Sequence, residues 1–397
     1  MPTASLKNIL DATFRANPEC ELVLFERLPP EQQEYLKDLR KEPDFYGVFC
    51  PRGEASLTMK SAPRDAALIY LTLREPGRLP EFVRAMFGAG CNQAVAQLVL
   101  DGILQIECDG AFVSRLQAYR AIYEEAAARE AGGFIARLSL DAIKYAQRLE
   151  LSDTIQLASR LYFYNRIPAN SQWRRMFPSR EAVLAYLGVQ SGGPNQTAIS
   201  WGWTRSGGGP ANGWLHWTAR KRAERRHSGF GYKLYISPKC EAIPEAFKTV
   251  AEVLATSGAS HFKTGQDLYG LLRPDKIVSY FPDFESLQNA AAELARRLDG
   301  CPPHGVPFTA EMAGGGLLSW GVDPPLEEQT FGSQARESWR LWVTNRLATA
   351  LLAGKASLAS GVEPWQFALE RLRLEDIDTD TWTPATGIWQ REAAART

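Results

Sequence analysis

Apolar positions in the first half of the chain recur mostly at helical spacing. Residues 91–100 place Val95, Leu98 and Val99 on one face of a helix. The segment 80–88 opens with proline and closes with glycine, as short helices often do. The same spacing predicts three further helices, over residues 116–131, 139–149 and 153–164.

A hairpin signal follows the two helices near residue 90. Apolar runs flank Cys108-Asp109-Gly110, and an Asp-Gly step between such runs is typical of a tight β-turn. The order helix, helix, hairpin indicates a winged-helix module at residues 60–116. An incidental helix and hairpin packed on a helical bundle fits the same pattern, so both interpretations stay open.

The pattern changes in the second half of the chain to short alternating runs between amphipathic helices. Strands are predicted over residues 232–238, 261–263, 275–281, 305–311 and 316–321, and helices over 244–258, 284–298 and 335–353. Asp283 is the expected N-cap of the second helix. Strands joined to helices and turns in this way predict an α+β fold with a mainly antiparallel sheet.

The clearest break lies at residues 190–213, which are rich in Gly, Ser, Asn and Pro. We therefore expect a helical N-terminal region over residues 1–190, a loop or linker over 191–213 and an α+β domain over 214–397.

Composition narrows the classes of protein. The 397 residues include 45 basic and 45 acidic ones, and this zero net charge disfavours a dedicated nucleic-acid binder. No apolar run reaches the roughly 18 residues that span a bilayer. The six cysteines are scattered without a CxxC pair, as reduced thiols of a cytoplasmic protein are. We expect a cytoplasmic protein without a nucleic-acid or membrane partner.

Motifs for several common chemistries are missing from the sequence. It contains no phosphate-binding loop, dinucleotide fingerprint or nucleophile elbow, and its four histidines lie far apart. Asp376, Asp378 and Asp380 resemble the start of a calcium loop but lack the glycine and glutamate that must follow. We interpret them as a solvated acidic turn and predict neither metal nor cofactor.

Two groups of cations remain to be explained. Residues 218–233 contain a basic run, which is either a solvated face or a flap over an anionic substrate. Lys233, Lys263, Arg273 and Arg336 stand in separate predicted elements beside apolar or aromatic residues. They are either exposed-face residues or cations that converge on a phosphate.

At these residues the sequence resembles the HopA-type family, which comprises effectors of plant-pathogenic bacteria and relatives encoded in bacterial peptide-natural-product clusters. The resemblance rests on LLRPDKIVSYF, GVPFTA, TFGSQAR and the Arg-x-Tyr-x-x-Asn segment within RLYFYNRIP. It covers roughly residues 155–350 and leaves 1–150 outside. It implies that Arg160 and Asn165 contribute to binding the substrate.

More distantly, KLYIS, FKTG and the following R…Y are similar to phosphothreonine lyases of enteric pathogens and to lyase domains of lanthipeptide synthetases. Those enzymes eliminate phosphate from phosphoserine or phosphothreonine and leave dehydroalanine or dehydrobutyrine. The resemblance implies that Lys263 is the base. It also implies that Lys233, Arg273 and Arg336 hold the phosphate and that Tyr280 positions it.

Such an elimination sets its own chemical requirements. A lysine base must be neutral when it acts, and neighbouring cations and burial lower its pKa toward that state. No cofactor is needed. The chain has no kinase motif, so a separate kinase would supply the phosphate on a precursor peptide, in lanthipeptide or thioamitide-type biosynthesis. A winged-helix module could bind that peptide by strand addition at residues 91–116.

One departure concerns the general acid. The lyases carry histidine two residues after the first lysine, where this sequence has Tyr235. A phenol can donate a proton, and His261 and His304 are alternative acids. The tyrosine equally fits a protein that binds phosphopeptides without catalysis and partners a kinase. A type III effector that acts on a host protein is a further alternative.

Overall fold

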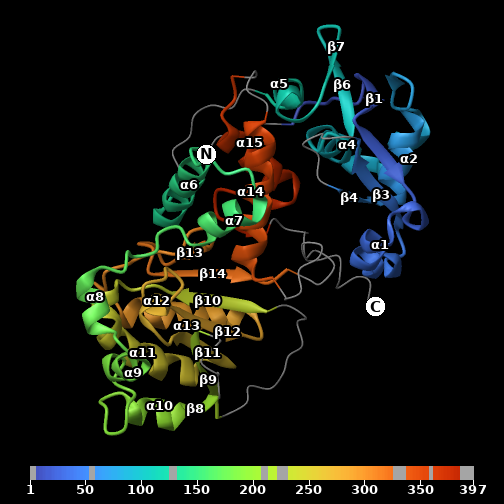
Figure 1. Cartoon of the computed structure of the whole chain (residues 1–397). Helices are drawn as coiled ribbons and strands as arrows, with labels where there is room; N and C mark the ends of the chain where they lie inside the picture. Colours follow the sequence, from blue (N-terminus) through green and yellow to red (C-terminus); the bar gives the residue numbers. More distant parts are fainter. Residues whose placement is uncertain are drawn as a thin grey trace. The chain divides into compact units, whose positions relative to one another are not determined.

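The computed structural model describes residues 6–52, 59–124, 132–206, 213–220, 231–324, 337–356 and 361–384 (Figure 1). The chain forms two compact units. Unit 1 contains Met1–Glu130, Thr330–Gln334 and Arg346–Asp376. Unit 2 contains Ala131–Gln329, Ala335–Asn345 and Ile377–Thr397.

Unit 2 is built on a seven-stranded sheet in the order β13-β14-β10-β12-β11-β9-β8, with every neighbouring pair antiparallel. The strands are β8 (Trp203–Ser206), β9 (Trp214–Ala219), β10 (Tyr232–Ile236), β11 (His261–Gly265), β12 (Ile277–Phe281), β13 (Ala310–Met312) and β14 (Leu318–Val322). The predicted α+β class with a mainly antiparallel sheet is confirmed.

One face of this sheet forms an apolar core with α11 (Ile243–Thr256) and α13 (Phe284–Arg297). Trp217 and Phe262 stack at 4.8 Å between ring centres, and both lie against Phe247 of α11. Since successive side chains of a strand point to opposite faces, the residues between these core positions gather on the other face.

The predicted N-cap of α13 is present: the Asp283 carboxylate accepts a hydrogen bond from the Ser286 amide at 2.7 Å. The long helix predicted over residues 335–353 is α14 (Trp339–Lys355). Its residues up to Asn345 belong to unit 2 and those from Arg346 to unit 1. The predicted site residue Arg336 lies outside the described residues, as do residues 221–230 of the basic run.

The predicted division of the chain at residues 190–213 is wrong. Four helices that precede it belong to unit 2, and Trp173 and Val183 pack into the core of its sheet. Of the expected linker, the described part includes a helix and the edge strand β8. The four helices are α6 (Phe134–Gln147), α7 (Thr154–Tyr162), α8 (Ser171–Met176) and α9 (Arg180–Tyr186), and the helix within the expected linker is α10 (Gln196–Gly202).

Unit 1 holds two small sheets, in the orders β5-β1-β6-β7 and β2-β3-β4. Its strands are β1 (Thr13–Ala16), β2 (Cys20–Val23), β3 (Phe45–Pro51), β4 (Lys60–Pro63), β5 (Gly77–Arg78), β6 (Leu104–Cys108) and β7 (Ala111–Val113). Its helices include α1 (Pro30–Leu36), α2 (Arg64–Thr72), α3 (Glu81–Phe87), α4 (Cys91–Leu100), α5 (Tyr119–Ile122) and α15 (Pro364–Leu374).

The predicted hairpin is confirmed as β6 and β7, and Asp109 and Gly110 both have positive φ, as a type I′ turn requires. Of the helix expected over residues 116–131, the described part, which ends at residue 124, contains a 3-10 turn at Arg115–Ala118 and the single turn α5. The order α3, α4, β6, β7 agrees with the predicted module, but β1 separates β5 from the hairpin. The winged-helix arrangement therefore stays a prediction.

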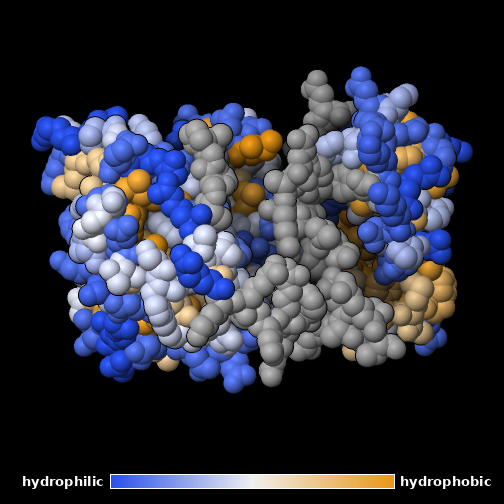
Figure 2. Space-filling view, turned by 90° about the horizontal axis from the view of Figure 1, so that it is seen from below, coloured by the Kyte–Doolittle hydropathy of each residue, from blue (hydrophilic) through white to orange (hydrophobic). Residues whose placement is uncertain are grey.

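In the part of the chain that the structure describes, no helix combines the length and apolarity needed to cross a bilayer. Within the same residues no cluster of three His, Cys, Asp or Glu side chains is arranged to hold a metal ion. Asp378 accepts hydrogen bonds from the amides of Asp380 and Thr381, so the acidic segment is a turn as predicted. On the face shown in Figure 2, hydrophobic residues form separate patches among hydrophilic ones.

Candidate functional site

The register of the sheet brings the predicted lysines of unit 2 onto one face. Lys233 lies opposite Tyr280, and Tyr280 lies opposite His261 on the next strand. In the adjacent row, Val278 lies between Tyr235 and Lys263. Residues two apart on a strand share a face, so both rows line the face that does not contact α11 and α13.

Among the described residues, Lys263 is the cation of this face that forms no ion pair with a carboxylate. Its Nζ lies 4.3 Å from the ring centre of Trp214 and 5.8 Å from that of Tyr280. Within the described residues it makes no ion pair or hydrogen bond through Nζ. Burial, followed by repulsion from Lys233, lowers the pKa of Lys263 to about 8. A usable fraction of this amine is therefore neutral near neutral pH.

Lys233 is held more tightly. It is 8% exposed and forms an ion pair of 2.6 Å with Asp323. Its Nζ lies 5.3 Å from the ring centre of Tyr280, so this one ring contacts both lysines. Burial, followed by Asp323, raises the pKa of Tyr280, so its phenol stays protonated and contributes a ring face and a hydroxyl.

Arg273 belongs to a network centred on Asp275. The two carboxylate oxygens of Asp275 accept bonds from Nε and Nη2 of Arg273 at 2.8 and 2.9 Å, and one of them lies 2.9 Å from Nη1 of Arg340. Nη2 of Arg273 also donates to the Tyr162 hydroxyl at 3.2 Å. Burial alone would raise the pKa of Asp275, but the two guanidinium groups hold it far below its usual range.

The ring of Trp214 connects this network to Lys263. The guanidinium carbon of Arg273 lies 4.9 Å from the Trp214 ring centre, and the same ring contacts Lys263. Three of the four cations predicted to converge, Lys233, Lys263 and Arg273, are therefore gathered at Trp214 and Tyr280.

The charges of this site leave a positive excess. Among the described side chains, four cations (Lys233, Lys263, Arg273 and Arg340) surround two carboxylates (Asp275 and Asp323). A surplus of positive charge in a partly buried site is costly unless an anion neutralises it. A phosphate group, with two negative charges and several acceptor oxygens, matches that surplus.

Tyr235 lies on the same face of the sheet as the lysines but is buried. It is 3% exposed and packs with Val278 and Val306. Burial, followed by the carboxylate of Asp323, holds the pKa of Tyr235 well above its ordinary value. A phenol in this position is a weaker acid than an exposed one, which counts against its predicted role as general acid.

The histidines suggested as substitute acids are poorly suited to that role. Both ring nitrogens of His304 are engaged, Nδ1 with Lys276 Nζ and Nε2 with the Asn165 carbonyl, each at 2.6 Å. Burial, followed by Lys276, lowers its pKa to about 3. His261 stacks on Tyr280 at 4.0 Å between ring centres, and burial, then His216, lowers its pKa to about 4. Both are neutral at pH 7.

The side chain of Asn165 connects the segment that follows α7 to residues 304–305. Its side-chain amide donates to the carbonyls of His304 and Gly305 at 2.9 and 3.1 Å, and its own φ is +66°. Asparagine tolerates this left-handed conformation better than most residues. The structure thus gives the Asn165 amide backbone partners, which explains the residue without a substrate.

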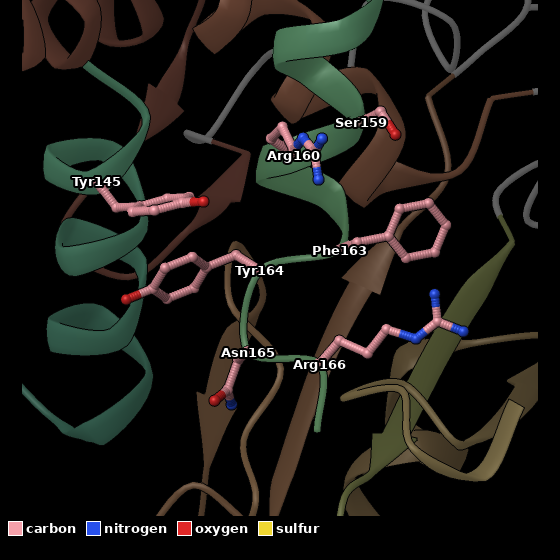
Figure 3. A pocket seen from close by; sticks show the side chains of 7 residues that line it. All are labelled: Tyr145, Ser159, Arg160, Phe163, Tyr164, Asn165 and Arg166. Carbon is pink, nitrogen blue, oxygen red and sulfur yellow. The ribbon is translucent and has the colours of Figure 1, made fainter. Parts of the chain in front are cut away.

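A pocket of about 460 Å³ opens where α7 ends (Figure 3). Arg160 is exposed and lines it, together with Tyr145 of α6 and residues 163–166. The Phe163 ring joins pocket and cation cluster, since the guanidinium carbon of Arg166 lies 5.4 Å from its centre and that of Arg273 lies 5.3 Å away.

Sequence reasoning missed Asp275, Asp323 and Arg340. Asp275 follows Arg273 by two residues inside LLRPDKIVSYF, so the segment itself carried the signal for a pair. Arg340 carried a weaker one, as an arginine between tryptophans in a helix. It is 1% exposed and donates to the Tyr162 and Pro307 carbonyls.

Comparison with solved structures finds low similarity to bacterial effectors. An effector from Pseudomonas syringae pv. tomato strain DC3000 is 13% identical, with 62% of this chain and 97% of that chain covered and a TM-score of 0.37. One from P. syringae pv. syringae strain 61 is 13% identical, with 64% and 98% covered and a TM-score of 0.38. The type III effector and phosphothreonine lyase OspF from Shigella flexneri is 14% identical, with 38% and 88% covered and a TM-score of 0.28.

No protein-family model and no curated protein matches the chain. Structural likeness at these TM-scores establishes neither fold nor activity. The functional conclusion therefore rests on the residues of the site.

Proposed function

We propose that unit 2 is a phosphoserine or phosphothreonine lyase. It would eliminate phosphate from a phosphorylated peptide and leave dehydroalanine or dehydrobutyrine. The observation that carries this proposal is Lys263, an amine with no carboxylate partner among the described residues and a pKa lowered to about 8 by burial and by Lys233. Lys233 and Arg273, which the sequence resemblance assigns to phosphate binding, lie beside it.

The reaction divides between these side chains. The neutral Nζ of Lys263 takes the α-proton and becomes an ammonium. The electron pair forms the Cα–Cβ double bond, and the Cβ–O bond breaks with its electrons on the departing phosphate. Lys233 and Arg273 neutralise the charge that grows on that group, which fixed cations do better than water in a partly buried site.

The departing oxygen also needs a proton. We assign this proton to the Lys233 ammonium, because Tyr235 is buried with a raised pKa and His304 has both nitrogens engaged. After the products leave, Lys263 gives its extra proton to solvent and Lys233 takes up a proton from solvent. Arg340 and Asp275 do not react in this scheme; they hold Arg273 in place.

The test uses synthetic phosphoserine and phosphothreonine peptides and mass spectrometry. Wild-type protein should remove one phosphoric acid per phosphorylated residue, and the product should add a thiol at the new double bond. Lys263→Ala should abolish the loss, whereas Lys248→Ala, an exposed lysine of α11, should not.

Tyr235→Phe separates the two candidate acids. It should keep most of the activity if Lys233 supplies the proton, and should lose about 10²-fold or more if the phenol does. Undiminished phosphate loss in Lys263→Ala would refute the assignment of the base.

One observation favours a second candidate, a phosphopeptide-binding scaffold that partners a kinase. Tyr235 occupies the place of the lyases' histidine and is buried, so the site lacks a strong acid at that position. Such a scaffold would bind phosphopeptides in a salt-sensitive way through Arg273 without any mass loss.

The biosynthetic setting is part of the same proposal. The sequence resemblance to HopA-type proteins of peptide-natural-product clusters suggests a ribosomal precursor peptide, in lanthipeptide or thioamitide-type biosynthesis, with a separate kinase. A precursor gene and a kinase gene beside this one would support that setting, whereas secretion genes would favour an effector that acts on a host protein.

A further inference from the structure

We propose that the pocket at the end of α7 binds an acidic side chain of the substrate peptide, two or three residues from the phosphorylated one. The inference rests on the proposed function only in that the occupant belongs to the same phosphopeptide. It gives Arg160 a role separate from holding the phosphate that leaves.

The lining of the pocket carries positive charge and no carboxylate of its own. Two of its lining residues are arginines, and none is acidic. Arg160 is exposed and makes no ion pair or hydrogen bond through its side chain within the described residues. Arg166, in the part of the chain that the structure describes, donates only to a backbone carbonyl, that of Tyr269, at 3.0 Å. Carboxylates outside the lining act on its residues, Asp141 on Tyr164 and both Asp267 and Asp275 on Arg166.

Three aromatic rings line the same pocket. Tyr145 and Tyr164 pack against each other at 5.5 Å between ring centres and form one wall (Figure 3). Phe163 contributes to the lining nearer Arg166. A glutamate places two methylene groups below its carboxylate, so it can lay apolar carbon on these rings while its oxygens reach the guanidinium groups.

The pocket lies one aromatic ring away from Arg273 of the cation cluster. A single ring, Phe163, contacts Arg166 on the pocket side and Arg273 on the cation cluster. An extended peptide advances about 3.3–3.6 Å per residue, so two or three residues cover about 7–10 Å. A peptide whose phosphate sits at Arg273 can therefore place a nearby side chain in the pocket.

The segment that carries the pocket is fixed from two sides. The carbonyl of Tyr162 accepts a bond from Arg340, and the carbonyl of Asn165 is engaged by His304. Lys276, which is fully buried, contacts the same histidine at 2.6 Å. The pocket therefore exists before a peptide arrives, and binding does not have to order it.

The test measures peptide affinity by fluorescence anisotropy, which does not depend on turnover. The probes are labelled seven-residue glycine peptides with a central phosphoserine and one glutamate at each of the other six positions in turn. Matched peptides carry glutamine instead. At one or two positions glutamate should bind about three- to fivefold more tightly than glutamine, the range expected for a partly exposed ion pair.

Arg160→Gln should remove this preference while the dependence on phosphoserine remains. Arg175→Gln, an exposed arginine of α8 outside the pocket, should leave it intact. The charge swap Arg160→Glu should favour peptides with lysine at the same position, which no merely structural role of Arg160 would produce.

The proposal would be overturned if glutamate and glutamine peptides bound equally at all positions. It would also be overturned if the preference survived in Arg160→Gln, or if no peptide bound measurably. Failure of the proposed function would be seen in a different measurement. In that case peptides would bind with this preference, but mass spectrometry would detect no loss of phosphate from them.

Discussion

Lys263 differs from the neighbouring cations in what surrounds it. Lys233 has Asp323, and Arg273 and Arg340 share Asp275, but Lys263 faces aromatic rings and other cations. A carboxylate beside it would stabilise the ammonium and remove the base. The distribution of two carboxylates among four cations thus separates the residues that hold an anion from the one that can take a proton.

The rate of elimination should follow the ionisation of Lys263. With a pKa of about 8, the neutral fraction grows roughly tenfold per pH unit below 8 and levels off above it. The phosphate monoester loses its second proton near pH 6, so it is a dianion over most of this range. kcat/KM measured from pH 6.5 to 9.5 should therefore rise and reach a plateau.

The control is the circular dichroism spectrum over the same range, which should stay constant. A rate that falls between pH 7 and 9 would instead show that a protonated acid limits the reaction, and would contradict the assignment of the base.

At the scale of elements, the Asp275 carboxylate joins parts of unit 2 that are distant in sequence. It precedes β12, pairs with Arg273 after α12 (Leu268–Leu271) and with Arg340 in α14, and lies 3.4 Å from the hydroxyl of Tyr162 at the end of α7. Loss of the carboxylate leaves the buried guanidinium group of Arg340 and the partly buried one of Arg273 without their counter-ion.

Asp275→Asn should lower the free energy of unfolding at pH 7 by about 3–5 kcal/mol, as measured for buried pairs that lose one partner. Because the folded pKa of Asp275 is depressed, this stabilisation is present above the unfolded pKa of about 3.9 and is lost as pH falls below it. Urea unfolding at pH 7 and pH 3 should show the difference shrinking.

The matched control is Glu293→Gln, which removes an exposed pair with Arg296 on α13 and should leave unfolding unchanged. A difference between Asp275→Asn and wild type that stays constant down to pH 3 would show that the carboxylate charge is not the cause.

At the scale of the whole molecule, the chain has two compact units, and all described residues of the cation cluster belong to unit 2. Each unit has its own apolar core. A ligand that binds folded unit 2 alone stabilises that unit by mass action and leaves the intrinsic stability of unit 1 unchanged.

Inorganic phosphate should therefore raise the unfolding temperature of one calorimetric transition and not the other. At a concentration 100 times Kd the gain is about 2.7 kcal/mol, or on the order of 5–10 °C for a unit of this size. Chloride at equal ionic strength is the control, and Arg273→Gln should abolish the shift. If the units unfold together, the single transition should shift in wild type and not in the variant.

The sequence by itself determined what depends on near neighbours. Strand alternation put Lys233 and Tyr235 on one face of β10, and Asp-Gly and Asp283 fixed a turn and a helix start. These features follow from backbone geometry over two to four residues. The resemblance in short motifs indicated which cations to expect at a phosphate site.

The tertiary structure decided the rest. Pairing of β12 with both β10 and β11 placed Tyr280 in the row of Lys233 and next to the row of Lys263. Contacts over long sequence separations assigned Asp275 to Arg340 and put α6–α10 with the sheet rather than with unit 1. No local periodicity encodes such pairings, because they depend on which apolar faces bury each other once the whole chain has folded.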